Sequence, residues 1–95
     1  MTLKTTGRET IEYKEFRDKV RKRDNYTCQM CYKRYKKVYV HHIIQYAKSA
    51  YLRLNTYNAI CLCYLCHKKV TGRENFYIEE LSKKAIENEL KYNSR

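Results

Sequence analysis

Two Cys-x-x-Cys pairs constrain the fold of this chain more than any other feature of its sequence. The first pair is Cys28 and Cys31, the second is Cys63 and Cys66, and residues 32–62 lie between the pairs. The chain has only 95 residues, and a domain of this size buries so little apolar surface that it usually needs a staple. We therefore expect the two pairs to meet at one site that holds the fold together.

Reduced thiols in two such pairs indicate a metal site. The opening segment, residues 1–8, lacks the hydrophobic stretch of a secretory signal peptide, so we expect a cytoplasmic protein whose cysteines stay reduced. Four thiolates in this arrangement suit tetrahedral Zn²⁺, and a completely filled ligand shell is typical of a structural site. Two disulfides, or four small core residues, are the alternatives. Cys61 lies in a predicted strand, where we expect a buried core thiol.

The chain is strongly basic. It has 21 Lys and Arg residues against 10 Asp and Glu residues, which gives a formal charge of +11, and four thiolates with one zinc ion would lower this by about two. Such an excess favours nucleic acid over a membrane as the partner, and no apolar run approaches the roughly 20 residues of a membrane span. The candidate phosphate-binding residues are Arg17, Lys19, Arg21, Lys22, Arg23, Lys33, Arg34, Lys36, Lys37, Lys68, Lys69 and Arg73.

The beginning of the chain predicts a loose lead-in followed by one helix. Residues 1–10 are mostly polar, whereas Ile11, Phe16 and Val20 form an irregular apolar stripe. Acidic residues come early in the segment 11–23 and basic residues come late, which is the order that a helix dipole favours. We expect a helix over 11–23 that either packs on the core or contacts DNA.

The remainder predicts a small α+β core within a single domain. The expected elements are a strand at Val38–Ile44, a loop over 45–57, a strand at Ile60–Leu62, a helix at Tyr64–Val70 that ends near Gly72, and a C-terminal helix over 75–92 capped by Asn75. No proline, repeat or change of composition divides the chain. We therefore expect one domain over 1–95, with its core in 11–74.

Asn58 and all three histidines of the chain lie between or directly beside the cysteine pairs. They are His41, His42, Asn58 and His67. The order Cys-x-x-Cys, His-His, Asn, Cys-x-x-Cys-His, spread over about residues 12–74, resembles the zinc-stapled form of the HNH endonuclease family. The resemblance implies a ββα-metal (His-Me finger) fold that hydrolyses DNA phosphodiester bonds with one divalent metal ion.

The resemblance also implies a role for each of these side chains. His41 and His67 would bind the catalytic ion, His42 would be the general base, and Asn58 would fix the loop around that base. Independently of the family, neighbouring residues in a strand point to opposite faces, so adjacent histidines are not expected to bind the same ion. A further His, found in some relatives one turn after His67, is Thr71 here. Two imidazole ligands favour Mn²⁺, Ni²⁺ or Co²⁺ over Mg²⁺.

Two positions depart from the family pattern. Tyr32 stands where the cysteine knuckle often has Gly, and Gln45 stands where a Pro often follows the His pair. Two alternatives for the histidines stay open. His67 could replace one cysteine in the zinc site, and the pair His41 and His42 could be a polar strand edge.

The leading hypothesis is a DNA endonuclease with a one-metal mechanism. The resemblance implies the compact type of phages and mobile elements, acting on double-stranded DNA in the bacterial cytoplasm during homing, nicking or packaging. One active site nicks one strand, so cutting both strands would need a homodimer or a phage protein partner. A non-catalytic zinc-ribbon module that binds nucleic acid is the alternative. A nuclease domain delivered by a larger toxin is a third possibility.

Overall fold

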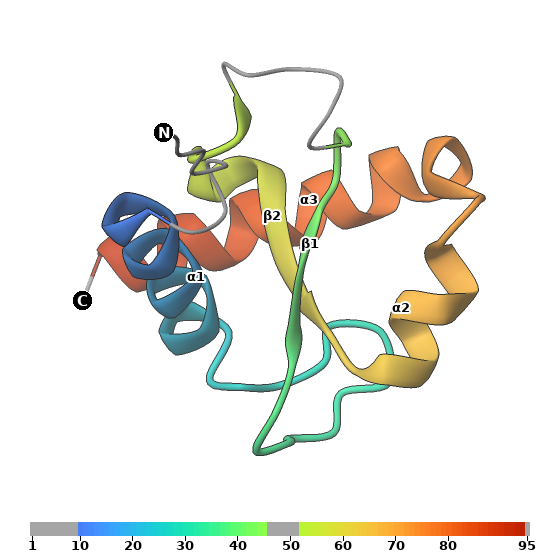
Figure 1. The fold of residues 1–95 in the computed structure, drawn as a ribbon, viewed down its shortest axis with the longest axis horizontal. Helices are drawn as coiled ribbons and strands as arrows, with labels where there is room; N and C mark the ends of the chain where they lie inside the picture. Colours follow the sequence, from blue (N-terminus) through green and yellow to red (C-terminus); the bar gives the residue numbers. More distant parts are fainter. Residues whose placement is uncertain (1–9, 46–51, 95) are drawn as a thin grey trace, which may run out of the picture.

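Figure 1 shows the computed structural model of the chain, which describes residues 10–45 and 52–94. Its elements in chain order are α1 (Ile11–Arg23), β1 (Tyr39–His42), the 3₁₀ helix η4 (Thr56–Asn58), β2 (Ala59–Leu62), α2 (Tyr64–Val70) and α3 (Glu74–Asn93). The two strands form one antiparallel hairpin that packs against helices. The predicted α+β class, with two strands followed by a helix, is confirmed. None of the helices in the described ranges is long and apolar enough to cross a membrane.

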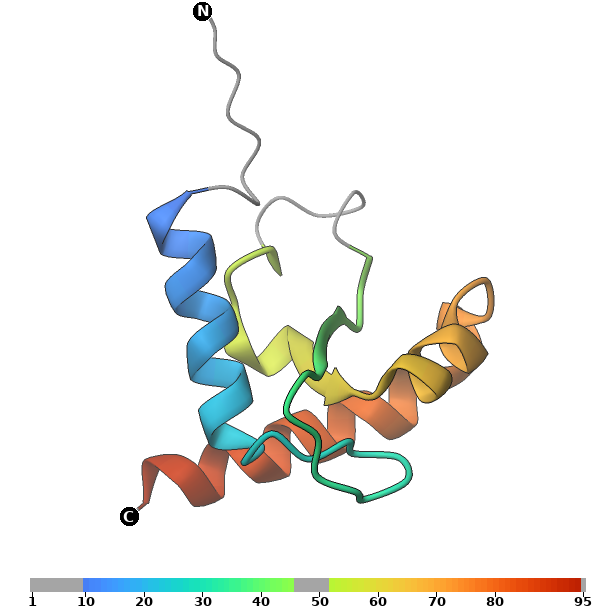
Figure 2. The ribbon, with the colours of Figure 1, turned by 60° about the horizontal axis from the view of Figure 1, so that its bottom comes forward.

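Strand β2 is the centre of the molecule. All four of its residues are buried, because α1 and α3 both pack against it while β1 pairs along its edge (Figure 2). Alternate residues of the strand belong to two different cores, as the period of two requires. One core consists of Tyr13, Phe16, Val20, Val38, Ala59 and Cys61. The other consists of Cys28, Ile43, Ile60, Leu62, Cys63, Val70, Leu81 and Ala85.

The prediction that Cys61 is a buried core thiol is confirmed. It is fully buried and lies 3.7 Å from the carbonyl oxygen of Val20 in α1. Burial raises the pKa of this thiol, so it stays protonated and apolar in character. Cys61 is therefore a packing residue of the core, in contrast to the four cysteines of the Cys-x-x-Cys pairs.

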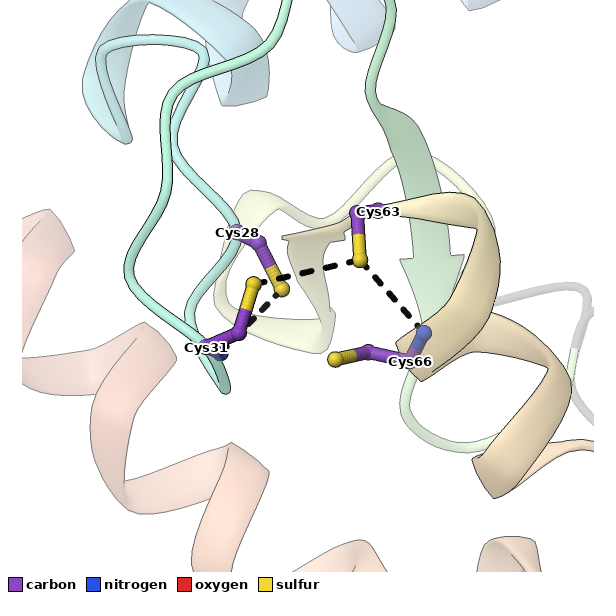
Figure 3. A group of neighbouring side chains, drawn as sticks. All are labelled: Cys28, Cys31, Cys63 and Cys66. Carbon is purple, nitrogen blue, oxygen red and sulfur yellow. Dashed lines mark hydrogen bonds between the residues drawn. The ribbon is translucent and has the colours of Figure 1, made fainter.

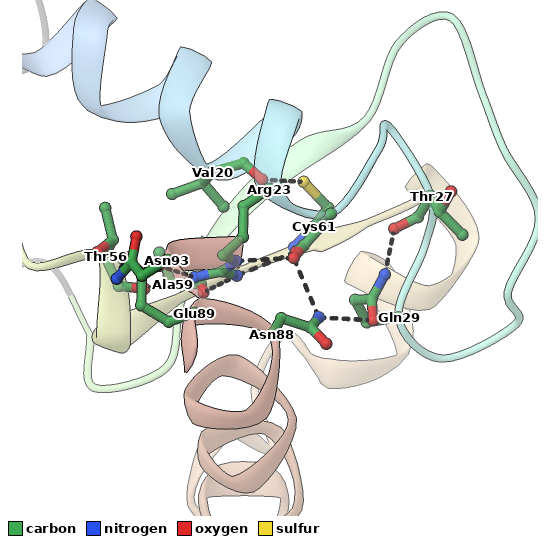
Figure 4. Close-up of polar contacts among 11 residues, drawn as sticks. Val20, Arg23, Thr27, Gln29, Thr56, Ala59, Cys61, Asn88, Glu89 and Asn93 are labelled. Carbon is green, nitrogen blue, oxygen red and sulfur yellow. Dashed lines mark hydrogen bonds and ion pairs between the residues drawn. The ribbon is translucent and has the colours of Figure 1, made fainter. Parts of the chain in front are cut away.

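A buried ion pair ties the end of α1 to the strand and to α3. The side chain of Arg23 is 1% exposed and bonds Asp24 at 2.8 Å and Glu89 at 3.1 Å. It also donates to the carbonyl oxygens of Thr56 and Ala59, both at 2.8 Å (Figure 4). The prediction that Arg23 contacts DNA is therefore wrong, because its guanidinium lies inside the protein with carboxylate and carbonyl partners.

Two predicted boundaries at the start and middle of the chain are corrected. Thr10 is not part of a loose lead-in: it is the N-cap of α1, and its hydroxyl accepts from the Tyr13 N–H at 3.1 Å. Residues 1–9 lie outside the described residues. Strand β1 ends at His42. Beyond it the backbone N–H of Ile43 still donates to the Asn58 carbonyl at 2.9 Å, and the N–H of Ile44 donates to the Asn58 side chain. Of the predicted loop, 46–51 lie outside the described residues.

The predicted cap of the C-terminal helix is also wrong. Asn75 lies inside α3, which begins at Glu74, and Arg73 occupies the N-cap position without capping the helix through its side chain. The turn before the helix is held differently. Both carboxylate oxygens of Glu74 accept from the backbone N–H of Gly72 at 3.1 Å, and Gly72 has a φ of 86°, which favours glycine.

Candidate active site and metal centre

The four cysteines of the Cys-x-x-Cys pairs converge on one point between the first knuckle and the start of α2. Their sulfur atoms all lie within 4.8 Å of one another (Figure 3). The Sγ atoms of Cys31 and Cys63 are 3.9 Å apart, close to the edge of about 3.8 Å for a tetrahedron with metal–sulfur bonds near 2.3 Å. All are free thiols, so the disulfide alternative is wrong. The cluster can hold a metal ion, and four sulfur donors suggest structural zinc.

Hydrogen bonds around the sulfur atoms favour thiolates. Backbone N–H groups donate to Cys28 Sγ from Met30 at 3.4 Å and from Cys31 at 3.5 Å. The hydroxyl of Tyr35 lies 3.5 Å from Cys31 Sγ. That contact, followed by a backbone bond from Lys33, lowers the pKa of Cys31 to about 6. Such outer partners orient the ligands. Burial raises the pKa of the Cys66 thiol to about 12, so a bound zinc ion itself would have to deprotonate this ligand.

Tyr32 shows how the knuckle forms without glycine. Its φ is 63°, in the left-handed region, and its backbone N–H donates to the Cys28 carbonyl at 2.8 Å to close the turn. The side chain is held from α3: Lys84 Nζ lies 4.7 Å from the ring centroid and also contacts the hydroxyl. Tyr32 thus adopts the backbone conformation that glycine provides more easily, and gains contacts that glycine lacks.

The two histidines of β1 face opposite sides of the hairpin. The ring of His42 stacks on Phe16 at 5.5 Å and on Tyr13 at 5.9 Å, on the side of α1. The ring of His41 meets that of His67 edge-on at 5.5 Å, on the side of α2. The strand alternation therefore separates the adjacent histidines and pairs one of them with the histidine of the helix.

The ring of His42 is oriented by a backbone carbonyl. Its Nε2 lies 2.9 Å from the carbonyl oxygen of Arg53. A carbonyl oxygen only accepts, so Nε2 carries the hydrogen and Nδ1 carries the lone pair in the neutral ring. The imidazole is buried, with 8% of the residue exposed. This arrangement sets the tautomer in which Nδ1 is the basic nitrogen.

The side chain of Asn58 bonds the backbone at Ile44, just after β1, and at Leu52, just before Arg53. Its Oδ1 accepts from the backbone N–H of Ile44 at 2.8 Å, and its Nδ2 donates to the carbonyls of Ile44 at 3.1 Å and Leu52 at 3.4 Å. Leu52 directly precedes Arg53, whose carbonyl contacts His42. The buried amide therefore fixes the backbone that orients the His42 ring.

His41 and His67 are neutral imidazoles beside a carboxylate. Burial, followed by the charge of His67, lowers the pKa of His41 to about 4, and burial also lowers the pKa of His67. Glu74 opposes both shifts electrostatically. Hydrogen bonds from its own backbone N–H and that of Gly72 lower its pKa, so it is a carboxylate at neutral pH. Neutral imidazole is the form of histidine that binds metals.

These side chains line one cavity of about 570 Å³ that extends over β1 from α1 to α2 and the start of α3. Its lining residues are Tyr13, Arg17, Arg21, Tyr39, Val40, His41, His42, Gln45, His67 and Glu74. Sequence reasoning did not single out Glu74. The one available signal was an acidic residue shortly after Gly72, at the point where the chain turns back towards the hairpin.

The predicted ligands and basic residues fall into distinct groups. The four cysteines come together, and His67 lies beside His41 in the cavity and outside the cysteine cluster. Among the described residues, the cysteines form the only group of three or more donors that could hold a metal ion. Arg21 lines the cavity. The other predicted phosphate contacts, apart from Arg17 and Arg23, are exposed: Lys19, Lys22, Lys33, Arg34, Lys36, Lys37, Lys68, Lys69 and Arg73.

Comparison with known proteins agrees with this geometry. Residues 28–73 match the HNH endonuclease family. The matched segment contains both cysteine pairs, β1, β2, α2, and the His-His, Asn and His positions. No curated protein and no solved structure matches the chain. The chain therefore contains a domain of the HNH endonuclease family, which comprises phosphodiester hydrolases.

Proposed function

We propose that this protein is a DNA endonuclease that uses one divalent metal ion, with its catalytic core in residues 11–74 and His42 as the general base. The observation that carries the proposal is the position of His42. It shares a cavity with His41 and His67, and its Nε2 is held by a backbone carbonyl. A base and a pair of candidate metal ligands therefore face the same space from the two sides of one strand.

The base acts on the attacking water. A neutral imidazole takes a proton at the nitrogen that carries the lone pair, which is Nδ1 in His42. The Arg53 carbonyl stabilises the imidazolium that results, because it continues to accept from Nε2. Asn58 acts through this carbonyl, as a positioning residue, since it bonds the backbone of Leu52 next to Arg53.

His41 and His67 would hold the catalytic ion. Both are neutral imidazoles with lowered pKa values, and the carboxylate of Glu74 adds negative charge to the same wall of the cavity. When bound, a divalent ion would stabilise charge on the phosphate and on the leaving oxygen. With two imidazole ligands we expect Mn²⁺, Ni²⁺ or Co²⁺ to support more activity than Mg²⁺. Structural Zn²⁺ would be held by Cys28, Cys31, Cys63 and Cys66.

Double-stranded DNA is the proposed substrate. The chain carries a formal charge of +11, and the exposed basic residues of α2 and its following turn lie next to His67 in the chain. Phosphate contacts of this kind give affinity without base recognition. We place the protein among the compact nucleases of phages and mobile elements, which act in the bacterial cytoplasm. A monomer would nick, and a homodimer or phage partner would be needed to cut both strands.

The test is cleavage of supercoiled plasmid by zinc-loaded protein with Mg²⁺, Mn²⁺, Ni²⁺ or Co²⁺, or with no second metal added. We expect metal-dependent nicking that falls at least about a hundredfold in His42→Ala, the size typical of losing a general base.

The zinc content and the thermal midpoint of the His42→Ala variant must match those of the wild type. Lys14→Ala, an exposed residue of α1 that does not line the cavity, is the control. Equal cleavage by His42→Ala and wild type would contradict the assignment. A zinc-loaded wild type that binds DNA without cutting it would favour the zinc-ribbon module.

A further inference from the structure

Helix α1 presents a stripe of three residues to the active-site cavity. Tyr13, Arg17 and Arg21 follow one another at intervals of four and all line the cavity. On the other side of β1, the cavity is lined by His67 and Glu74. The cavity is thus polarised: guanidinium groups form one wall, and imidazoles with a carboxylate form the other. The arginines also precede residues 28–73, so the family match assigns them no role.

Arg17 is half-buried and differs from Arg23, the buried arginine of α1. The Nε of Arg17 is the only buried side-chain nitrogen or oxygen in the described part of the chain without a hydrogen-bond partner. The guanidinium carbon lies 5.1 Å from the ring centroid of Tyr13, a ring that itself stacks with His42 at 5.9 Å. Arg23, by contrast, bonds two carboxylates and two carbonyls. A buried donor is normally satisfied, so this exception calls for an explanation. Because Arg17 also lines the cavity, a ligand bound there would supply an acceptor to its guanidinium.

Arg21 is anchored beside it. Its Nε donates to the carbonyl of Val38 at 3.4 Å, and its Nη1 lies 3.6 Å from a carboxylate oxygen of Asp18. These contacts hold a second positive charge at the same wall. The acceptor that suits two neighbouring guanidinium groups is a phosphate, because its oxygens take two parallel N–H bonds from a planar guanidinium.

We propose that Arg17, supported by Arg21, binds the phosphate group that is hydrolysed, an inference that rests on the proposed nuclease function. In the reaction, the water oxygen forms a new bond to phosphorus and its proton passes to His42. The bond from phosphorus to the leaving sugar oxygen breaks, and that oxygen takes up a proton from solvent. Arg17 stays protonated throughout. It stabilises the negative charge on the non-bridging oxygens from the wall opposite Glu74.

The experiment compares single-turnover plasmid nicking with DNA binding by zinc-loaded protein to which no second metal has been added. Arg17→Ala removes the charge, Arg17→Met keeps the aliphatic packing on Tyr13, and Arg17→Lys keeps the charge without the planar fork. We expect nicking at saturating protein to fall at least about tenfold in the Ala and Met variants, with Kd changed less than about threefold because one phosphate contact among many is lost. The Lys variant should be intermediate. Lys14→Ala, on the exposed side of α1, should match the wild type.

Two outcomes would overturn the inference while leaving the nuclease function intact. One is nicking by folded, zinc-loaded Arg17→Met at the rate of Lys14→Ala. The other is a parallel loss of nicking and of DNA affinity that is fully restored by raising the protein concentration, which would make Arg17 an ordinary phosphate contact. The Met variant keeps the test decisive if Arg17→Ala fails to fold. Absence of nicking by the wild type itself would contradict the proposed function, and this inference with it.

Discussion

Adjacent histidines in β1 differ in what surrounds each ring. His41 is buried against His67, and its pKa falls to about 4. His42 packs on the aromatic rings of α1 and bonds a backbone carbonyl. The pleat of the strand causes this difference, because it turns neighbouring side chains to opposite faces. Substitutions at the two positions should therefore separate metal binding from proton transfer.

Asn58→Ala is expected to weaken both the fold and the reaction. The change removes the side-chain partners of the Ile44 backbone and of the Leu52 carbonyl. Buried groups left unpaired cost about 1–3 kcal/mol each, so unfolding in urea should show a loss of about 2–4 kcal/mol. Nicking at a temperature where the variant is folded should also fall, because the Arg53 carbonyl loses its support. Asn93→Ala, at the exposed end of α3, is the matched control, and equal stability of the two variants would contradict the prediction.

His41 should make stability depend on pH. Its pKa is about 4 in the folded protein against 6.5 for the free side chain, so the unfolded chain binds more protons between these values. The free energy of unfolding is therefore highest above pH 6.5 and decreases as the pH falls towards 4, because the unfolded chain takes up a proton that the folded protein does not bind. Between pH 7 and pH 5 the loss should be about 2 kcal/mol. Urea unfolding of zinc-loaded protein without a second metal measures it. His41→Gln should show a shallower decline, and parallel curves for the two proteins would rule out this origin.

At the scale of the elements, the sequence predicts the bounds of two helices better than it predicts the contacts that their side chains make. The helices at 11–23 and Tyr64–Val70 were predicted at their observed bounds, because apolar spacing and charge order act within each helix. The burial of Arg23 was missed, since its partner Glu89 comes from α3, far along the chain. Local basic character at the end of α1 resembled a DNA contact. In the folded protein, Asp24 and, from α3, Glu89 neutralise this charge in the interior.

In the candidate site too, some features were predicted from the sequence and others depend on the fold. The convergence of the cysteines followed from their spacing, and the opposite faces of His41 and His42 followed from strand geometry. Glu74 was not predicted as a cavity residue. Its position depends on the turn at Gly72, where the carboxylate bonds the backbone and fixes the start of α3. The apolar period of α3 reveals the side that packs on the core but carries no information about this first turn.

The buried ion pair between α1 and α3 should contribute strongly to stability. Arg23→Ala leaves Asp24 buried, with its charge no longer compensated. Breaking a buried pair from one side typically costs about 3–5 kcal/mol, and we expect a loss of this size in urea unfolding. Lys22→Ala, the exposed neighbour on the same helix, should change stability by less than about 0.5 kcal/mol. A small effect of Arg23→Ala would mean that Asn88, which also donates to Asp24, suffices to hold the carboxylate.

At the scale of the whole molecule, the four-cysteine cluster connects the segment after α1 with the start of α2. Cys28 and Cys31 follow α1, whereas Cys63 and Cys66 open α2 and directly follow β2. Metal bound there would therefore tie the knuckle after α1 to the element that carries His67. The two cores on either side of β2 are small. A chain of 95 residues with such cores has little stability to lose, since ordinary domains have only about 5–15 kcal/mol.

Removal of zinc is therefore expected to unfold the protein rather than to loosen one loop. Zinc binding to four thiolates contributes roughly 10–16 kcal/mol at pH 7 in small zinc domains, as much as the whole stability expected of this chain. A chelator should abolish both the helical circular dichroism and nicking, and Zn²⁺ should restore both. Cys66→Ala should lose zinc, whereas Cys61→Ala should retain one zinc per chain, because Cys61 is a buried core thiol outside the cluster. Zinc-free protein that keeps its helical signal and a cooperative thermal transition would show that the two cores hold the fold unaided, and would confine the metal to a local role at the knuckle.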